Sequence, residues 1–111
     1  MTLREQLHAR CRGYCEKCGW PLGANWAMHH RVLQSRRDVI TNVMALHHEC
    51  HNLGKDAVHL NVEQAMDDGY IVSQAYDPAE IPLLLRGHTW TLLTPEGTYR
   101  YLTEERDHAA P

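Results

Sequence analysis

The sequence predicts a small α+β domain. Its 111 residues are the length of one domain, which can bury only a modest core. Short segments with helical spacing alternate with short segments of alternating apolar residues, so helices and antiparallel strands are both expected. Two pairs of metal-binding residues, Cys15-x-x-Cys18 and His47-x-x-Cys50, are separated by a hairpin-sized stretch. A metal shared by these pairs would stabilise a core of this size, so we expect a zinc-stabilised fold.

The first half is predicted to contain a helix, a hairpin and a second helix. Residues 3–10 have helical spacing, and Thr2 is placed to cap them. Strands are expected over residues 26–33 and 43–46. A helix is expected from residue 48 to about residue 58, although Gly54 weakens that prediction.

The second half is predicted to add a short helix and a β-hairpin. The helix covers residues 62–68 after Asn61 as N-cap, and residues 70–75 are expected to be extended. The hairpin pairs residues 90–93 with residues 99–102 around a Pro- and Gly-containing turn. We therefore divide the chain into a metal-bearing module (1–58) and a C-terminal extension (59–111), packed together as a single compact domain overall.

Charge is distributed unevenly around the formal net value of −3. Residues 1–55 contain eight Lys and Arg and four Asp and Glu, a formal charge of +4. Residues 56–111 contain three Arg and ten Asp and Glu, a formal charge of −7. All four Cys and six of the nine His lie in the basic part. We expect this part to face a phosphate-bearing partner, although small proteins also acquire such asymmetry by chance.

The cysteine pattern indicates metal binding. An even count could mean disulfides, but residues 1–6 lack the apolar core of a signal peptide, and no apolar run reaches the roughly 18 residues of a membrane span. We therefore expect a cytoplasmic protein with no membrane partner. A redox C-x-x-C remains an alternative, although a turn follows Cys18 instead of a helix. Three thiolates and one imidazole suit Zn²⁺. The spacing to Cys50 favours His47 over His48 as the fourth ligand, and Cys11 is expected to be a buried apolar residue.

Four further polar residues are not needed by a structural zinc site. They are His29, His30, Asn42 and His51. They surround the predicted hairpin and the start of the helix that follows it. Because they lie in one local unit, a purely structural role for all of them is the less favoured reading. The remaining histidines, His59, His88 and His108, are expected to be structural or exposed.

The order of these residues resembles the HNH endonuclease family, whose fold is called ββα-metal. The resemblance rests on Cys15-x-x-Cys18, His29-His30, Asn42 and His47-x-x-Cys50-His51-Asn52, with eight residues between Asn42 and His51. It covers residues 4–56, half of the chain. The sequence is similar in particular to the zinc-bearing members of this family, many of which are encoded by bacteriophages and prophages. The expected fold is then a small ββα-metal core with an N-terminal helix and a C-terminal helix plus β-hairpin extension.

The resemblance implies a role for each of these residues. His30 matches the general base, Asn42 matches the residue that holds the loop and orients His30, and His51 matches a ligand of a catalytic divalent metal. His29 stands where the family often has an aspartate, as the second metal ligand. Two imidazoles favour Mn²⁺ or Ni²⁺ relative to a carboxylate-containing site, which suits Mg²⁺.

The resemblance also implies an activity and partners. The activity is metal-dependent hydrolysis of double-stranded DNA, leaving 5′-phosphate and 3′-hydroxyl ends. Candidate contacts to backbone phosphates are Arg31, Arg36, Arg37 and Lys55. A phage-encoded protein would act in the cytoplasm of the host cell, and the C-terminal part could meet a packaging or other protein partner. The alternative is a non-catalytic zinc module that binds DNA or a protein.

Overall fold

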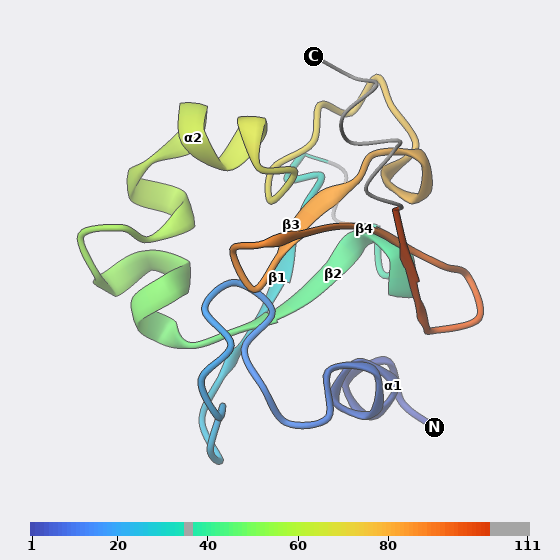
Figure 1. Cartoon of the computed structure of the whole chain (residues 1–111), viewed down its shortest axis with the longest axis horizontal. Helices are drawn as coiled ribbons and strands as arrows, with labels where there is room; N and C mark the ends of the chain where they lie inside the picture. The colour runs from blue at the N-terminus through green and yellow to red at the C-terminus, as the bar shows by residue number, and fades with distance from the viewer. Residues whose placement is uncertain (35–36, 103–111) are drawn as a thin grey trace.

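Two antiparallel sheets with helical segments on both sides make up the fold (Figure 1). The computed structural model describes residues 1–34 and 37–102. The strands are β1 (Ala27–His30), β2 (Val43–Leu46), β3 (Leu83–Leu85), β4 (Thr89–Leu93) and β5 (Tyr99–Tyr101). The helices are α1 (Leu3–Cys11) and α2 (Val62–Asp67), with shorter turns η1 (Ile40–Asn42), η2 (Glu49–Leu53), η3 (Val58–Leu60) and η4 (Pro78–Glu80). The small α+β domain is therefore confirmed.

The N-terminal helix α1 begins as the sequence predicts. Thr2 Oγ1 accepts from the Glu5 amide at 3.1 Å, and the Glu5 carboxylate accepts from the Thr2 amide at 2.8 Å. This capping box satisfies two amide groups that the first turn leaves without helical partners. The helix ends one residue later than predicted, where Arg12 adopts a left-handed conformation with φ +57°.

The first sheet consists of β1 and β2 in antiparallel register. His29 pairs with Met44 and His30 with Val43, and all four residues of β2 are buried. The predicted strand at 43–46 is confirmed. The predicted strand at 26–33 is shortened to four residues, because η1 precedes β2 and ends the ladder after His30.

The continuous helix predicted over residues 48–58 is wrong. The chain instead forms η2, one turn of π-helix, and then η3 after a break at Gly54. Gly54 leaves the helical conformation while its amide donates to Glu49 O at 2.9 Å. A Cβ at this position would lie 2.8 Å from the same oxygen, so only glycine closes the turn in this way. The break decides where the residues of η3 lie.

The second sheet contains one more strand than the sequence predicts. The hairpin is confirmed as β4 and β5, and β3 adds to the other edge of β4. Helix α2 is confirmed, but Asn61 does not cap it, because its amide donates to Lys55 O and Ala57 O. Residues 70–75, expected to be extended, form bends and turns.

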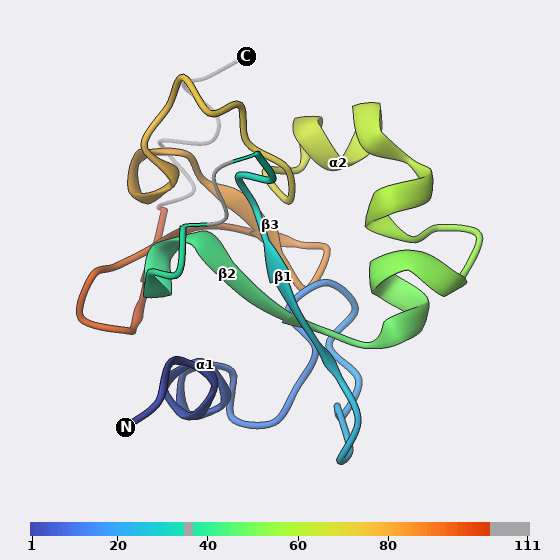
Figure 2. The ribbon, with the colours of Figure 1, turned by 180° about the vertical axis from the view of Figure 1, so that it is seen from behind.

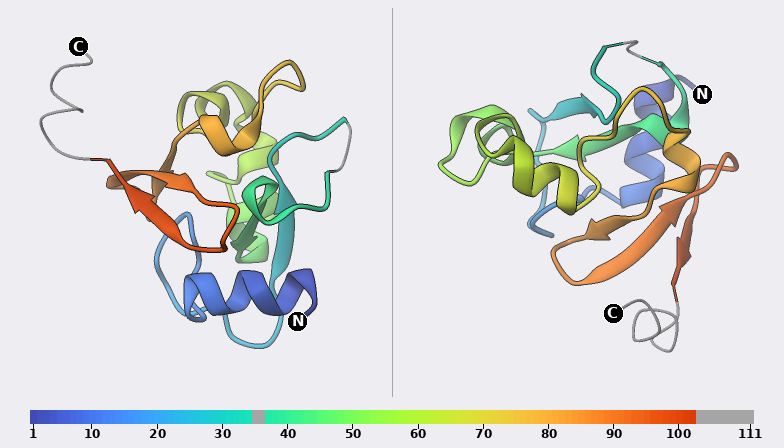
Figure 3. Two further views of the ribbon diagram at one scale, coloured as in Figure 1. Left: turned by 90° about the vertical axis from the view of Figure 1, so that its right-hand side faces the viewer. Right: turned by 90° about the horizontal axis from the view of Figure 1, so that it is seen from above.

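A single core joins the two predicted parts of the chain. Leu7 and Met44 from the first part belong to the same buried cluster as Tyr70, Leu83 and Leu93 from the second. The stretch that holds η2, η3 and α2 lies on the side of the β1–β2 hairpin away from α1 (Figures 2 and 3). No helix of the described residues is long and apolar enough to cross a membrane.

A buried ion pair links elements that are distant in sequence. Arg10 from α1 binds Glu16 with two contacts of 2.9 Å, and both side chains are fully buried. The Glu16 carboxylate also accepts from the Ala45 amide at 2.9 Å and from the Tyr99 hydroxyl at 2.5 Å. Because a buried charge needs several partners, these contacts hold α1, β2 and β5 together.

Candidate metal centres

The four residues predicted to bind zinc lie together. The ligand atoms of Cys15, Cys18, His47 and Cys50 are all within 4.8 Å of one another, and we call them the Cys₃His cluster. Cys15 and Cys18 lie on a turn closed by hydrogen bonds from the Cys15 amide to Trp20 O and from the Gly19 amide to Cys15 O. His47 follows β2, and Cys50 lies on η2. These four residues could hold a metal such as zinc, because their number and type match a closed tetrahedral site.

The hydrogen bond that His47 makes through Nε2 leaves Nδ1, the nitrogen beside Cys18, to bind a metal. Its Nε2 donates to Pro21 O at 2.6 Å, so Nδ1 carries the lone pair. That Nδ1 lies 3.3 Å from Cys18 Sγ. The pKa of Cys15 is lowered to about 4, first because the Cys50 thiol donates a hydrogen bond to it. The same shared proton raises the pKa of Cys50. The cluster therefore already favours a thiolate, which is the form that binds a metal.

Cys11 and His48, which were not expected to be zinc ligands, lie outside this cluster. Cys11 is buried in the core, where its thiol donates to His8 O at 3.6 Å. His48 is exposed. Both predictions are confirmed.

A second group of metal-binding side chains lies beside the first. It contains His29 on β1, His51 on η2 and His59 on η3, with their ligand nitrogens within 4.8 Å of one another, and we call it the three-histidine cluster. The ring centroids of His51 and His59 are 4.6 Å apart, and those of His29 lie 5.3 and 5.2 Å from them. His59 was expected to be structural or exposed; it is half-buried and lies beside His29 and His51. The break at Gly54 turns η3 back toward η2, which spacing alone did not reveal.

His29 has the surroundings of a metal ligand. Its side chain is 1% exposed, its Nε2 donates to Tyr70 O at 2.6 Å, and its Nδ1 has no hydrogen-bond partner. Burial lowers the pKa of His29 to about 3, and burial also lowers the pKa of His51. Both rings are therefore neutral at pH 7 and keep a lone pair. A buried nitrogen without a partner is rare, and a bound cation is one way to satisfy it.

The three-histidine cluster opens into a hollow that also contains His30. The hollow has a volume of about 260 Å³ and is lined by the cluster with Met28, His30 and Leu33. Within this lining His29 is buried, whereas 14% of the His30 side chain is exposed. His30 Nε2 lies 2.7 Å from Asp38 Oδ1. The sequence did not single out Asp38.

Asn42 holds the loop that follows β1. Its side chain is fully buried, with Oδ1 accepting from the Val32 amide at 2.9 Å and Nδ2 donating to Arg37 O at 3.0 Å. One side chain thus ties both ends of the segment between residues 32 and 37. These two contacts would suit the loop-holding role that the family resemblance implies for Asn42.

The arginines predicted to contact phosphates differ in their placement. The prediction for Arg31 is wrong, because its side chain is fully buried and burial lowers its pKa to about 9. Its guanidinium donates over 2.6–3.1 Å to the carbonyl groups of Thr41, Gly69, Pro78 and Ile81. These contacts tie β1 to the C-terminal part. Arg37 donates to Gln74 O and Tyr76 O, and Lys55 is exposed. Arg36 lies outside the described residues, as does His108, whereas His88 is exposed.

Comparison with known proteins returns no relative. No family model, no curated protein and no solved structure matches the chain. The two clusters and their surroundings are therefore the observations from which a function can be argued.

Proposed function

We propose that this chain is a metal-dependent DNA endonuclease of the HNH type. The observation that carries the proposal is the hollow in which the three-histidine cluster and His30 lie side by side. Three imidazoles can hold a divalent ion, and the adjacent His30 is placed to act as a general base. The order of residues that resembles the family supports the same reading.

The three-histidine cluster fits a catalytic metal better than a structural one. A structural site is closed by four protein ligands, whereas three ligands beside an open hollow leave a position for substrate or water. His29, His51 and His59 would hold the ion. Imidazole ligands favour Mn²⁺, Ni²⁺ or Zn²⁺ over Mg²⁺. When bound, such an ion would stabilise negative charge on the phosphodiester and on its leaving oxygen.

The remaining groups prepare the attacking water. The Asp38 carboxylate accepts from His30 Nε2–H, so Nδ1 of His30 keeps the lone pair that takes a proton from water. Asn42 holds the loop between β1 and Asp38 in place through its two backbone contacts. The expected products, by resemblance to the family, carry 5′-phosphate and 3′-hydroxyl ends.

A metal in the Cys₃His cluster would help to position the three-histidine cluster. Cys50 precedes His51 in η2, so an ion bound to the four cluster residues fixes the turn that carries His51. Zinc binding can supply most of the folding free energy of a small module. We therefore assign zinc a structural role and the three-histidine cluster a catalytic one.

Double-stranded DNA would lie over the hollow. Lys55 is exposed near η2 and can contact a phosphate without reading a base. We keep Arg36 and Arg37 as further candidates, and the Arg37 carbonyl accepts a hydrogen bond from Asn42. A cytoplasmic location in a phage-infected host, and a packaging partner for the C-terminal part, belong to the same proposal.

Plasmid nicking tests the proposal. The protein is incubated with supercoiled plasmid and Mn²⁺, Mg²⁺ or Ni²⁺, with the exposed His88→Ala variant as control. We expect His30→Ala to lose nicking while its zinc content stays at one ion per chain. Equal nicking by His30→Ala would overturn the assigned mechanism. DNA binding with no nicking in any metal would identify the non-catalytic zinc module instead.

A further inference from the structure

Two arginines adopt a backbone conformation that arginine rarely takes. Arg12 has φ +57° and Arg86 has φ +53°, and within the described residues every other positive φ belongs to a glycine. Arg12 ends α1, and Arg86 is a central residue of the turn between β3 and β4. The left-handed region costs an ordinary L-residue roughly 1–2 kcal/mol relative to the right-handed one. Residues kept in such conformations cluster at functional sites, so these two positions invite a functional explanation.

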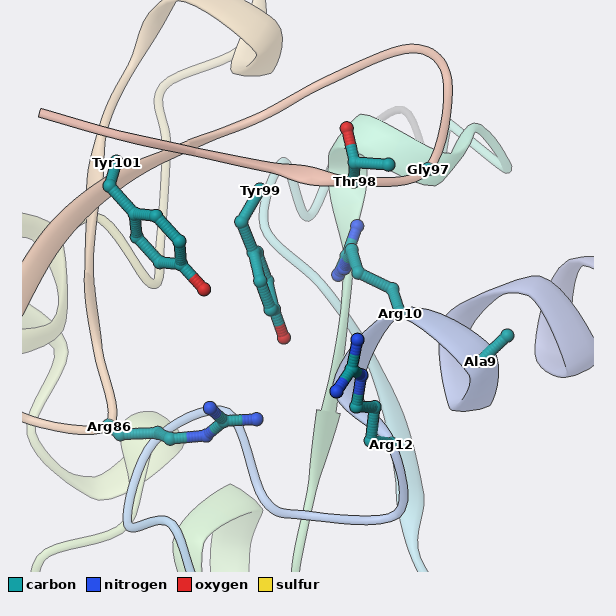
Figure 4. Close-up of a pocket in the computed structure, with 8 residues that line it drawn as sticks. All are labelled: Ala9, Arg10, Arg12, Arg86, Gly97, Thr98, Tyr99 and Tyr101. Carbon is teal, nitrogen blue, oxygen red and sulfur yellow. The ribbon is translucent and has the colours of Figure 1, made fainter.

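Both arginines line the same pocket. It has a volume of about 420 Å³ and lies between α1, the β3–β4 turn and β5; we call it the arginine pocket. Its polar and aromatic lining comes from Arg10, Arg12, Arg86, Tyr99 and Tyr101. In Figure 4 Arg86 and Arg12 enter from opposite sides, below Tyr99 and Tyr101, whose hydroxyl ends point toward them from β5. None of these residues belongs to the two metal clusters.

The pocket carries positive charge that the protein does not neutralise. Arg10 is paired with Glu16, but among the described residues Arg12 and Arg86 form no ion pair with a carboxylate. Arg86 Nη2 donates to Cys11 O at 3.1 Å, while its Nε is buried and has no hydrogen-bond partner. A buried guanidinium nitrogen without an acceptor is costly, so the protein does not fully satisfy the hydrogen-bonding capacity of Arg86.

Aromatic rings surround this charge. The Arg86 guanidinium lies 6.0 Å from the Tyr14 ring and 5.9 Å from the Tyr99 ring. Tyr99 is fixed by its hydroxyl, which donates to Glu16. Tyr101, two residues further along β5, is 59% exposed and offers a flat face at the rim. Guanidinium groups bind phosphate with paired hydrogen bonds, and exposed tyrosines stack on nucleic-acid bases.

We propose that the arginine pocket binds the phosphate of a nucleotide or of a nucleic-acid strand, with the attached base stacked on Tyr101. The site is separate from the three-histidine cluster and does not depend on the proposed cleavage. Arg12 and Arg86 bind the phosphate together, through the guanidinium groups that line the pocket. The left-handed backbone at both positions is retained because it points these two guanidinium groups into one pocket.

The positive φ values of Arg12 and Arg86 allow substitutions that remove the guanidinium group without destabilising the fold. Glycine is the preferred residue at the left-handed end of a helix, so Arg12→Gly removes the guanidinium and relieves the backbone. Arg86 and Gly87 both have positive φ, as in a type I′ turn, in which Asn-Gly is the preferred pair. Arg86→Asn therefore suits its turn. Arg100→Gln is the matched control, because Arg100 lies between Tyr99 and Tyr101 on β5 and does not line the pocket.

Calorimetric titration of the 111-residue chain, loaded with zinc and without a second metal, tests the proposal. The probes are inorganic phosphate, deoxyadenosine 5′-monophosphate and a single-stranded oligonucleotide without terminal phosphates. We expect Arg12→Gly and Arg86→Asn each to weaken binding about tenfold, the effect of one charge-assisted contact, with melting temperatures equal to or above that of the parent. Arg100→Gln should bind as the parent does, and Tyr101→Ala should weaken the nucleotide but not inorganic phosphate.

Each outcome of the titration decides a point. If all three probes bind, the pocket accepts backbone phosphates. If inorganic phosphate and the mononucleotide bind but the oligonucleotide does not, the ligand is a free or terminal phosphate. Absence of binding by every probe would overturn the proposal. So would an equal loss in Arg100→Gln, or unchanged affinity in Arg12→Gly and Arg86→Asn variants that remain folded.

Discussion

The Cys₃His cluster and the three-histidine cluster share one short turn but offer a metal different surroundings. Cys50 belongs to the first and His51, the next residue, to the second. The first cluster presents three thiols and an imidazole, enough to close a tetrahedral site. The second presents three imidazoles at the edge of a hollow of about 260 Å³. The number of ligands and the adjoining space, more than the sequence spacing, distinguish a site that holds structure from one that can admit a substrate.

The adjacency of the clusters has a mechanical consequence. Any ion that fixes Cys50 also fixes the backbone of His51, because η2 is a single tight turn. The reverse coupling is weaker, since His29 and His59 are held by their own elements, β1 and η3. Loss of the first cluster should therefore abolish both sites, whereas loss of the second should leave the first intact.

The largest effect is expected for Cys15→Ser. Removing one thiolate breaks the four-ligand site, and structural zinc in small modules supplies on the order of 10 kcal/mol or more of folding free energy. We expect loss of zinc and of the cooperative unfolding transition, measured by metal analysis and circular dichroism.

Cys11→Ser is the matched control for this prediction, because Cys11 is equally buried but lies outside the cluster. It should retain one zinc ion per chain and lose only about 1–2 kcal/mol, the typical cost of burying a poorly paired hydroxyl. If both variants lose zinc alike, the ligand assignment is wrong.

A smaller and more selective effect is expected for His59→Ala. The substitution removes one of three imidazoles, and we expect nicking to fall about 100-fold, the scale of losses seen at perturbed metal sites. Zinc content and melting temperature should stay close to those of the parent. The exposed His48→Ala is the control. Full activity in His59→Ala would reduce the site to His29 and His51, as the sequence alone predicts.

Local spacing predicts the parts of the molecule whose partners are near in sequence. The capping box at Thr2, the strand at 43–46 and the final hairpin follow from patterns a few residues long. The pairs of the Cys₃His cluster follow from the C-x-x-C and H-x-x-C spacing. His59 could not be placed in this way, because its position depends on a backbone hydrogen bond across Gly54.

Charge counting is informative only after burial is known. Up to Lys55 the formal charge is +4, but Arg10 is neutralised by Glu16 and Arg31 is saturated by backbone carbonyls. In the acidic remainder, Arg86 contributes to the arginine pocket. The sequence therefore predicted the sign of each part, but not which arginines can reach a ligand, since burial is set by contacts between distant segments.

The smallest effect concerns the response of the three-histidine cluster to acid. Burial holds the pKa of His29 at about 3 in the folded chain, below its ordinary value of 6.5. Between these values the unfolded chain binds a proton that the folded chain does not. Stability is therefore complete above about pH 6.5 and is lost as the pH falls toward 3. From pH 7 to pH 5 the loss from His29 alone is about 2 kcal/mol.

His29→Gln isolates this contribution. Its amide can still donate to Tyr70 O but does not titrate, and the Cys₃His cluster is common to both proteins. Urea unfolding at pH 7 and pH 5, without added divalent metal, should show a smaller decrease in unfolding free energy for the variant. Equal decreases would mean that His29 already accepts a proton in the folded state. The contrast between an uncharged His29 and the Cys15 thiolate of the Cys₃His cluster would then not hold.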